Sequence, residues 1–157
     1  MKRTLLVAGG VVATLVLLAT IAFGATTAAP RLHQGRTITV IEHPTTDKVV
    51  DTGAPDDSPG DLLTFRNKLY NAGDTTIIGR DQGGCTRISP ALGTWQCAWT
   101  NVLEGGQIEV SGPFSDGHNT VLAVTGGTGR FQNVRGEMEL KAIAGGTKFA
   151  FVFHLIP

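Results

Sequence analysis

Short runs rich in valine, isoleucine, threonine and phenylalanine, cut at close intervals by glycine-containing turns, constrain the fold of this chain most. From Thr37 onward, no stretch shows the 3.6-residue apolar period of an amphipathic helix. Many short strands of this kind predict an all-β barrel or sandwich. Eight runs meet the description, at residues 37–43, 62–70, 75–88, 94–102, 107–114, 119–125, 137–144 and 148–156.

The order of these runs favours an eight-stranded antiparallel up-and-down β-barrel over residues 37–157. Turn signals at residues 104–106, 115–117 and 145–146 separate consecutive runs. Eight strands enclose an interior just wide enough for packed side chains or one small ligand. The last run is apolar on both faces, so we expect its outer face to pack on another subunit, in a dimer or trimer.

The N-terminus has the order of features found in secretory signals. Lys2 and Arg3 precede an uncharged apolar stretch at 5–23, which small residues follow. We predict a signal segment at 1–29, cleaved between 24 and 29. A lead-in, the first strand and a long polar loop then occupy 30–59. An uncleaved membrane anchor is the alternative, because the apolar stretch is long for a signal. With cleavage, the protein is secreted and has no membrane attachment.

The charge of the chain is balanced, with 13 basic and 13 acidic residues. Removal of Lys2 and Arg3 with the signal leaves a small acidic excess. A nucleic-acid partner would require a concentrated basic face, so we predict none.

The two cysteines, Cys85 and Cys97, are nearly equidistant from turn residues at 89–93. Export to an oxidising compartment favours a disulfide. Residues directly opposite each other in a hairpin have Cβ atoms close enough to bridge. A structural metal would need four ligands, and no histidine lies nearby, so we predict neither a metal nor a cofactor.

Two polar residues, Glu42 and Asn67, fall on otherwise apolar strand faces. Strand side chains alternate, so Glu42 shares a face with Ile38 and Val40, and Asn67 with Phe65 and Leu69. A buried carboxylate has a raised pKa, and a buried amide needs hydrogen-bond partners. The alternative is that Glu42 lies in water at the strand end and Asn67 bonds to the backbone.

The glycine-rich stretch Val124–Gly136, "VTGGTGRFQNVRG", raises the question of phosphate binding. It contains no lysine, which a P-loop requires, and no helix pattern follows it. The glycines instead indicate a tight turn with close backbone approach. Phe131 and Val134 would then close one end of the barrel, while Arg130 and Arg135 lie at the surface or pair with acids.

A resemblance to known proteins covers roughly residues 60–139. The segment 121–140, "VLAVTGGTGRFQNVRGEMEL", is similar to a Gly-Gly-x-Gly-x-Phe stretch of plant allene oxide cyclases and dirigent proteins. "GDLLTFRNKLYN", "IIGRDQGGC" and "GGQIEVSGPF" resemble further motifs of these families, in the same order. The chain is therefore identified as a member of the allene oxide cyclase/dirigent superfamily. The resemblance implies a calycin-like eight-stranded barrel with an internal pocket.

Similarity to allene oxide cyclases implies that Glu42 and Asn67 match the catalytic glutamate and asparagine of that family, and that Cys85 matches a pocket cysteine. The family's pocket tyrosine is replaced by Phe114, which donates no hydrogen bond. The substrate-binding walls would be Phe65 and Phe114. Similarity to dirigent proteins, which use pocket aspartates and an arginine, adds Asp81 and Arg87 as substrate-binding candidates.

These residues predict a secreted barrel that binds a small apolar or phenolic molecule and steers its cyclisation or coupling. Confinement of one reactive conformer would lower the entropic barrier. Glu42 would act as acid–base group and Asn67 as donor to a substrate oxygen. No nucleophile–base pair is visible, which excludes covalent catalysis of the hydrolase type. The alternative is a non-catalytic ligand-binding or structural barrel, since fold does not fix function.

Overall fold

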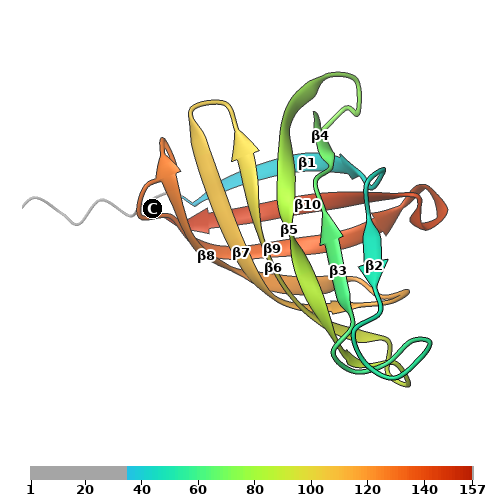
Figure 1. Cartoon of the computed structure of the whole chain (residues 1–157). Coiled ribbons are helices and arrows are strands. Elements are labelled where there is room, and N and C mark those ends of the chain that lie inside the picture. Colours follow the sequence, from blue (N-terminus) through green and yellow to red (C-terminus); the bar gives the residue numbers. More distant parts are fainter. Residues whose placement is uncertain (1–34, 157) are drawn as a thin grey trace, which may run out of the picture. The chain divides into compact units, whose positions relative to one another are not determined.

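A computed structural model describes residues 35–156, and the predicted signal segment therefore lies outside the described residues. Ten strands and one short 3-10 turn are present in this part of the chain (Figure 1). No helix among the described residues is long and apolar enough to cross a membrane. The elements are β1 (Arg36–His43), β2 (Lys48–Val50), β3 (Leu62–Phe65), β4 (Lys68–Asn71), β5 (Ile77–Ser89), β6 (Thr94–Leu103), β7 (Gly106–Ser115), β8 (Thr120–Gly129), β9 (Arg135–Ile143), η1 (Ala144–Gly146) and β10 (Lys148–Ile156).

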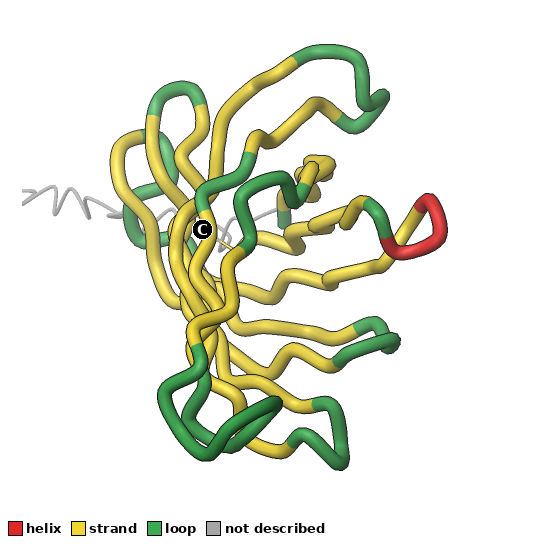
Figure 2. Tube along the Cα trace, turned by 45° about the vertical axis from the view of Figure 1, so that its right-hand side comes forward, coloured by secondary structure: helices red, strands yellow, loops and turns green. Residues whose placement is uncertain are grey.

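All strands belong to one antiparallel sheet that closes on itself (Figure 2). Hairpins join β5 through β10 in sequence, and β10 returns to pair with β1. Strands β3 and β4 pair with successive parts of β5, so they act as one interrupted strand. Likewise β2 continues the line of β1 beside β3. Counted in this way, the barrel has eight strands, as the sequence predicts.

Two local features differ from the expectations. The predicted polar loop after β1 contains β2, whose Lys48, Val49 and Val50 are all exposed. Strand β8 runs through Gly126 and Gly127 to Gly129, so the turn occupies the following residues only.

The glycine-rich stretch Val124–Gly136 comprises the end of β8, the turn after it and the start of β9. Gly129 has φ +59°, a conformation that favours glycine. A Cβ on Gly127 would lie 2.5 Å from the carbonyl oxygen of Gln107, so this position also tolerates no side chain. Phe131 and Val134, from the turn that follows, are buried in the apolar core and close this end of the barrel.

The interior is filled mainly by alternating apolar side chains. The last strand follows the parity read from its sequence, with Phe151, Phe153 and Leu155 buried inward. Gly83 on β5 leaves room for Trp99 on β6, because a Cβ at Gly83 would lie 2.4 Å from the Trp99 Cβ. The core cluster comprises Val40, Leu69, Cys85, Trp95, Cys97, Trp99, Leu103, Ile108, Val110, Leu122, Val124, Phe131, Val134, Met138, Leu140, Phe151, Phe153 and Leu155.

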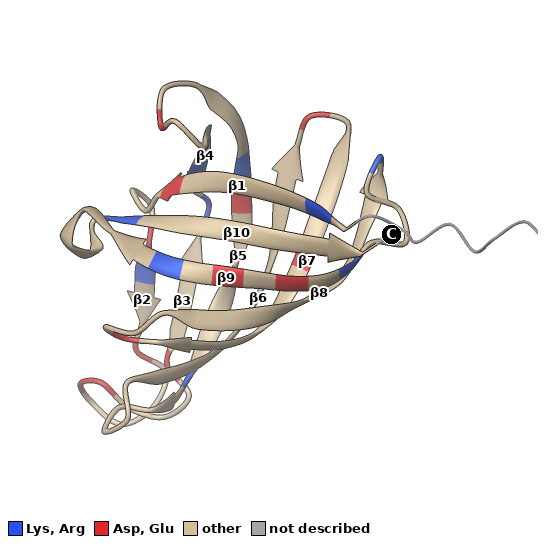
Figure 3. Cartoon of the chain, turned by 180° about the vertical axis from the view of Figure 1, so that it is seen from behind, with Lys and Arg blue, Asp and Glu red and all other residues tan. Residues whose placement is uncertain are grey.

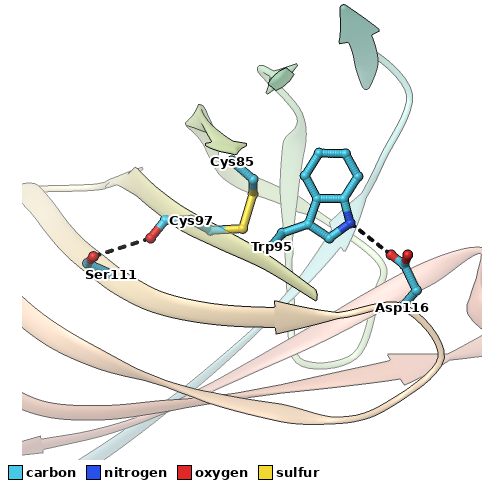
Figure 4. Close-up of a disulfide and its surroundings, with 5 residues drawn as sticks. All are labelled: Cys85, Trp95, Cys97, Ser111 and Asp116. Atoms are coloured by element: carbon cyan, nitrogen blue, oxygen red, sulfur yellow. Dashed lines mark hydrogen bonds between the residues drawn. A yellow bond between two sulfur atoms is a disulfide. The ribbon is translucent and has the colours of Figure 1, made fainter. Parts of the chain in front are cut away.

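Cys85 and Cys97 form a disulfide, as predicted, with Cα atoms 4.0 Å apart (Figure 4). They are direct partners in the β5–β6 ladder. Both side chains are buried and belong to the core, so the bridge forms part of the inner wall.

Charged side chains form ion pairs across β9 and β10, and Figure 3 shows acidic and basic residues along β9. Glu139 on β9 accepts from Lys141 and lies 3.3 Å from the His154 ring on β10. The expectation of a subunit contact on the outer face of β10 stays a prediction.

Candidate functional site

A small cavity lies at the end of the barrel where β1 ends and β10 begins. Its volume is about 40 Å³, enough for water but not for a ten-carbon guest. Glu42 and Asp47 line it on one side, and the Cys85–Cys97 bridge lines it on another. A larger ligand could enter only if side chains at the mouth moved.

Aromatic rings form most of the cavity wall. Trp99 lies between Phe65 and Phe151, with ring centres 5.9 and 5.6 Å away, and Phe114 meets Phe149 edge-on at 6.2 Å. Trp99 and Phe151 are buried, whereas Phe65, Phe114 and Phe149 are only partly buried. The predicted walls Phe65 and Phe114 therefore do line the cavity, and with Phe149 they are its partly buried rings.

Two neighbouring strands are interrupted beside this cavity. The β1–β2 line breaks at residues 44–47 and the β3–β4 line at residues 66–67, so ladder hydrogen bonds are missing there. The Asn67 side chain replaces them. Its Oδ1 accepts from the backbone N–H groups of Thr45 and Thr46, at 2.9 and 3.0 Å, and from the Thr46 hydroxyl. The amide thus holds the two broken strands together.

The other end of the Asn67 amide faces two carboxyl groups. Its Nδ2 donates to Glu42 Oε1 at 2.7 Å and to Asp47 Oδ1 at 2.6 Å. An amide nitrogen has two hydrogens, and both are used. Asn67 is 1 % exposed, so its polar atoms serve the protein in this structure. Asn67 and Glu42 are brought together, as the sequence predicts, but the amide has no free donor for a guest.

Asp81 on β5 completes an acidic cluster with Glu42 and Asp47. It is fully buried, and its Oδ1 accepts from the Asn67 backbone N–H at 2.9 Å. Its Oδ2 has no hydrogen-bond partner among the described residues. The Glu42 and Asp81 carboxyl groups are close enough for each to shift the pKa of the other. A proton held between them supplies the buried oxygens with the donor they otherwise lack.

Burial sets the protonation of this pair. Desolvation, and then the charge of Asp81, raises the pKa of Glu42 to about 9. Desolvation raises the pKa of Asp81 to about 6, against the backbone hydrogen bond from Asn67, which lowers it. Interacting carboxyl groups titrate as a pair, so these values describe the dyad. Near neutral pH the dyad holds one proton, mainly on Glu42.

Arg87, the remaining candidate, lies apart from the acidic cluster. Its Nε and Nη2 donate to Asp57 at 2.7 and 2.6 Å, and its Nη1 donates to Asp116 at 2.6 Å. Its guanidinium carbon stands 4.1 Å from the centre of the Trp95 ring. Trp95 in turn donates to Asp116 (Figure 4). The structure therefore places Arg87 in a cluster that anchors loop 51–61, and Arg87 does not line the cavity.

The sequence pattern missed Asp47, which falls in a polar loop where no strand parity applies. It also missed Trp99, Phe149 and Phe151 as cavity walls, although their strands show the alternating pattern. Among the described residues, no group of three or more His, Cys, Asp or Glu side chains is arranged to hold a metal ion.

The fold and the cavity together define a class of protein: a closed antiparallel β-barrel with an aromatic-walled internal pocket and a buried acid. Within that class, the family model described as allene oxide cyclase matches residues 42–156. The chain belongs to this family. The match begins at Glu42 and spans the remainder of the barrel.

Solved structures with other activities share the barrel. The structure titled pyocyanin demethylase is 25 % identical, with a TM-score of 0.67, and the match covers 76 % of this chain and 99 % of that chain. A pterocarpan synthase dirigent protein is 15 % identical, with a TM-score of 0.65 over 85 % and 98 % of the two chains. An exo-specific intermolecular Diels-Alderase is 14 % identical, with a TM-score of 0.62 over 78 % and 98 %. The last two likenesses establish the fold.

Proposed function

We propose that this protein binds a small apolar or aromatic molecule in its barrel and steers the cyclisation or coupling of that molecule. The observation that carries the proposal is a buried Glu42 in the wall of an aromatic-lined cavity, where desolvation raises its pKa to about 9. Support comes from the allene oxide cyclase family and from neighbours titled dirigent protein and Diels-Alderase. Secretion, predicted from the N-terminal segment, belongs to the same proposal.

Confinement supplies part of the proposed mechanism. Rings that close around a flexible guest restrict it to one folded conformer, which lowers the entropic barrier to ring closure. Phe65, Phe114 and Phe149 form the movable part of that wall, and Phe151 and Trp99 form the fixed part. The handedness of the product would follow from the shape that these rings leave open.

Glu42 supplies the proposed chemistry as a general acid. Its raised pKa keeps the proton available near neutral pH, and the proton would pass to an oxygen or nitrogen of the guest. Asn67 holds the Glu42 carboxyl in position, and Asp81 shares its proton. In this proposal both act through Glu42 as positioning residues, in place of the direct contact between Asn67 and substrate expected from the sequence. Arg87 keeps a structural role.

The test begins with identification of the guest. The full chain is expressed, incubated with small-molecule extracts and analysed for captured compounds by mass spectrometry. Turnover of the captured compound is then followed on a chiral column for wild type and for Glu42→Gln. We expect Glu42→Gln to reduce the rate by roughly 100-fold or more while capture persists. Equal rates in the two proteins would overturn the acid role.

Glu109→Gln is the matched control, because Glu109 is an exposed glutamate on the outside of β7. It removes one carboxylate without touching the cavity, so its rate should equal that of wild type. Fractionation of cells and medium, with sequencing of the mature N-terminus, tests secretion and the cleavage window at the same time.

A second candidate, a non-catalytic structural barrel, is favoured by the small size of the cavity, about 40 Å³. In that function the barrel would hold no guest. Failure of wild type and Glu42→Gln alike to capture any compound would support the structural barrel over the cyclase.

A further inference from the structure

The acidic cluster of Glu42, Asp47 and Asp81 has no cation. None of the ion pairs among the described residues includes any of the three. Three exposed basic residues lie on the adjoining strands: Lys48 on β2, Lys68 on β4 and Arg80 on β5. Lys68 and Arg80 lie one position away from inward-facing residues, and strand side chains alternate, so both point outward. The cluster therefore has no cation to balance its negative charge, and its hydrogen-bond donors come from Asn67.

The groups around the cluster do not compensate for it. Asn67 contributes a neutral amide from the β3–β4 interruption, and β10 contributes the Phe149 ring. Trp99 on β6 directs its indole N–H to Asn101, away from the cavity. The remaining wall is apolar. A guest in this cavity therefore meets the carboxyl groups of Glu42 and Asp47 and a wall made mainly of aromatic and aliphatic side chains.

Both features favour positive charge. The faces of aromatic rings carry negative potential and attract cations, more strongly when water is excluded. Carboxylates in a poorly hydrated site attract a cation more strongly than they do in water. A phenolate or carboxylate guest would be repelled by Asp47 and Asp81 and would find a single donor, the proton on Glu42.

We infer that the cavity selects a guest that is cationic when bound: a flat conjugated cation, or a weakly basic conjugated nitrogen or oxygen compound that takes the proton of Glu42. In the second form, the O–H bond of Glu42 breaks and an N–H or O–H bond forms on the guest. The total charge is unchanged, and the new cation lies beside the new carboxylate. This inference rests on the proposed function and assigns the substrate class of the same site.

Proton release follows for a permanent cation. Its charge favours the ionised form of the Glu42–Asp81 dyad, so binding expels the shared proton to solvent. The dyad consists of Glu42 from β1 and Asp81 from β5. The titratable group that faces it is Asp47, from the β1–β2 interruption. Affinity for a permanent cation should consequently rise from pH 6 to pH 9, whereas affinity for a neutral guest should not.

Three bicyclic probes of nearly equal shape test the inference: N-methylquinolinium, 1-methylnaphthalene and 1-naphthoate. Their affinities for the full chain are measured by displacement of the neutral fluorophore N-phenyl-1-naphthylamine. We expect the cation to bind at least about 10-fold more tightly than the neutral probe, and the anion to bind more weakly than both. Calorimetry in buffers of different ionisation enthalpy should show a fraction of a proton released per bound cation.

The outcomes separate the two proposals. Equal or tighter binding of 1-methylnaphthalene, with displacement of the fluorophore, overturns the charge inference and leaves the barrel-pocket function intact. Failure of the fluorophore and of all three probes to bind would count against the pocket function itself. Cation binding without proton release would overturn the role of the dyad.

Two variants assign the effect to the cluster. Asp47→Asn changes an exposed side chain, so the fold should persist, and we expect about a 3-fold or greater loss of cation affinity with neutral affinity unchanged. Glu42→Gln should abolish proton release. Glu109→Gln, which removes one negative charge as Asp47→Asn does, should match wild type in every measurement. An equal loss of cation affinity in Glu109→Gln would mean that overall charge, and not this cluster, attracts the probe.

Discussion

Two buried polar clusters share the inner face of β5, and they are built on opposite principles. At Arg87, one guanidinium lies between Asp57 and Asp116 and stacks on Trp95. At Asp81, six residues earlier, a carboxyl group meets Glu42 without a cation. The first cluster satisfies its charges with one another and stabilises the loop over the barrel. The second keeps carboxyl groups buried without a counter-charge, which is the arrangement expected of a site that binds a ligand or catalyses a reaction.

Among the substitutions, the largest loss of stability should come from the balanced cluster. Arg87→Met removes the guanidinium but leaves Asp57 and Asp116 half-exposed, so they regain water. We expect a loss of roughly 3 kcal/mol in the free energy of unfolding, at the lower end of what breaking a buried ion pair costs. Urea denaturation measures it. Arg80→Met, an exposed change on the same strand, is the control and should lie within about 0.5 kcal/mol of wild type. Similar losses in the two variants would refute the structural role of Arg87.

Asn67→Ala should give the next largest loss. The substitution leaves the backbone N–H groups of Thr45 and Thr46 without their acceptor and removes the link to Glu42. Unsatisfied groups of this kind cost about 1–3 kcal/mol, and we expect roughly 2 kcal/mol here. Asn71→Ala, in an exposed turn, should cost less than about 1 kcal/mol. A loss no greater than that of Asn71→Ala would show that the broken strands do not need the amide.

The cluster of Glu42, Asp47 and Asp81, which has no cation, should make the free energy of unfolding depend on pH. Because the native state raises the pKa of Glu42 to about 9, the native protein binds a proton that the unfolded chain releases above about 4.5. Stability should therefore fall as pH rises between these values, by up to about 1.4 kcal/mol per pH unit. Glu42→Gln should flatten the fall and should be the more stable protein at pH 8. Parallel curves for wild type and variant would contradict the assignment.

The smallest effect is expected for Asp116→Asn. Asp116 is about half-exposed, and an asparagine keeps the oxygen that accepts from Trp95. Exposed ion pairs contribute less than about 1 kcal/mol, so the loss should stay below that value. A loss as large as that of Arg87→Met would indicate that Asp116, and not Arg87, holds the cluster together.

Strand pattern and motif order were enough to predict the barrel. The period of two placed Glu42 and Asn67 inward, and the equal spacing of Cys85 and Cys97 about a turn predicted their pairing. Strand β2 was missed because its Lys48–Val50 run is short and lies in a proline-containing polar stretch. Strand pairing also continued through Gly126 and Gly127, after a register shift at Thr125, although glycine suggested a turn there, because ladder pairing outweighs local propensity.

The site was less predictable, because its geometry depends on two strand interruptions that face each other. Only the folded sheet shows that the Asn67 amide replaces the missing ladder hydrogen bonds, so that none of its donors is free for a ligand. Asp47 has no strand parity, so nothing in the sequence places it beside Glu42. Arg87 has the strand parity of an inward-facing residue, but its side chain binds Asp57 and Asp116 from two loops. These partners lie 30 and 29 residues away in the sequence, so the sequence pattern could not identify them.

The pairing of β1 with β10 has a consequence for biosynthesis. Synthesis proceeds from the N-terminus, so Arg36–His43 emerges long before its partner Lys148–Ile156. Until β10 is synthesised, the nascent protein is an open sheet with two free edges and uncovered aromatic rings. Such a form tends to aggregate with other copies of the chain. The disulfide ties only a local hairpin and cannot close the ring. Loss of β10 would thus leave an aggregation-prone open sheet in place of a shorter barrel.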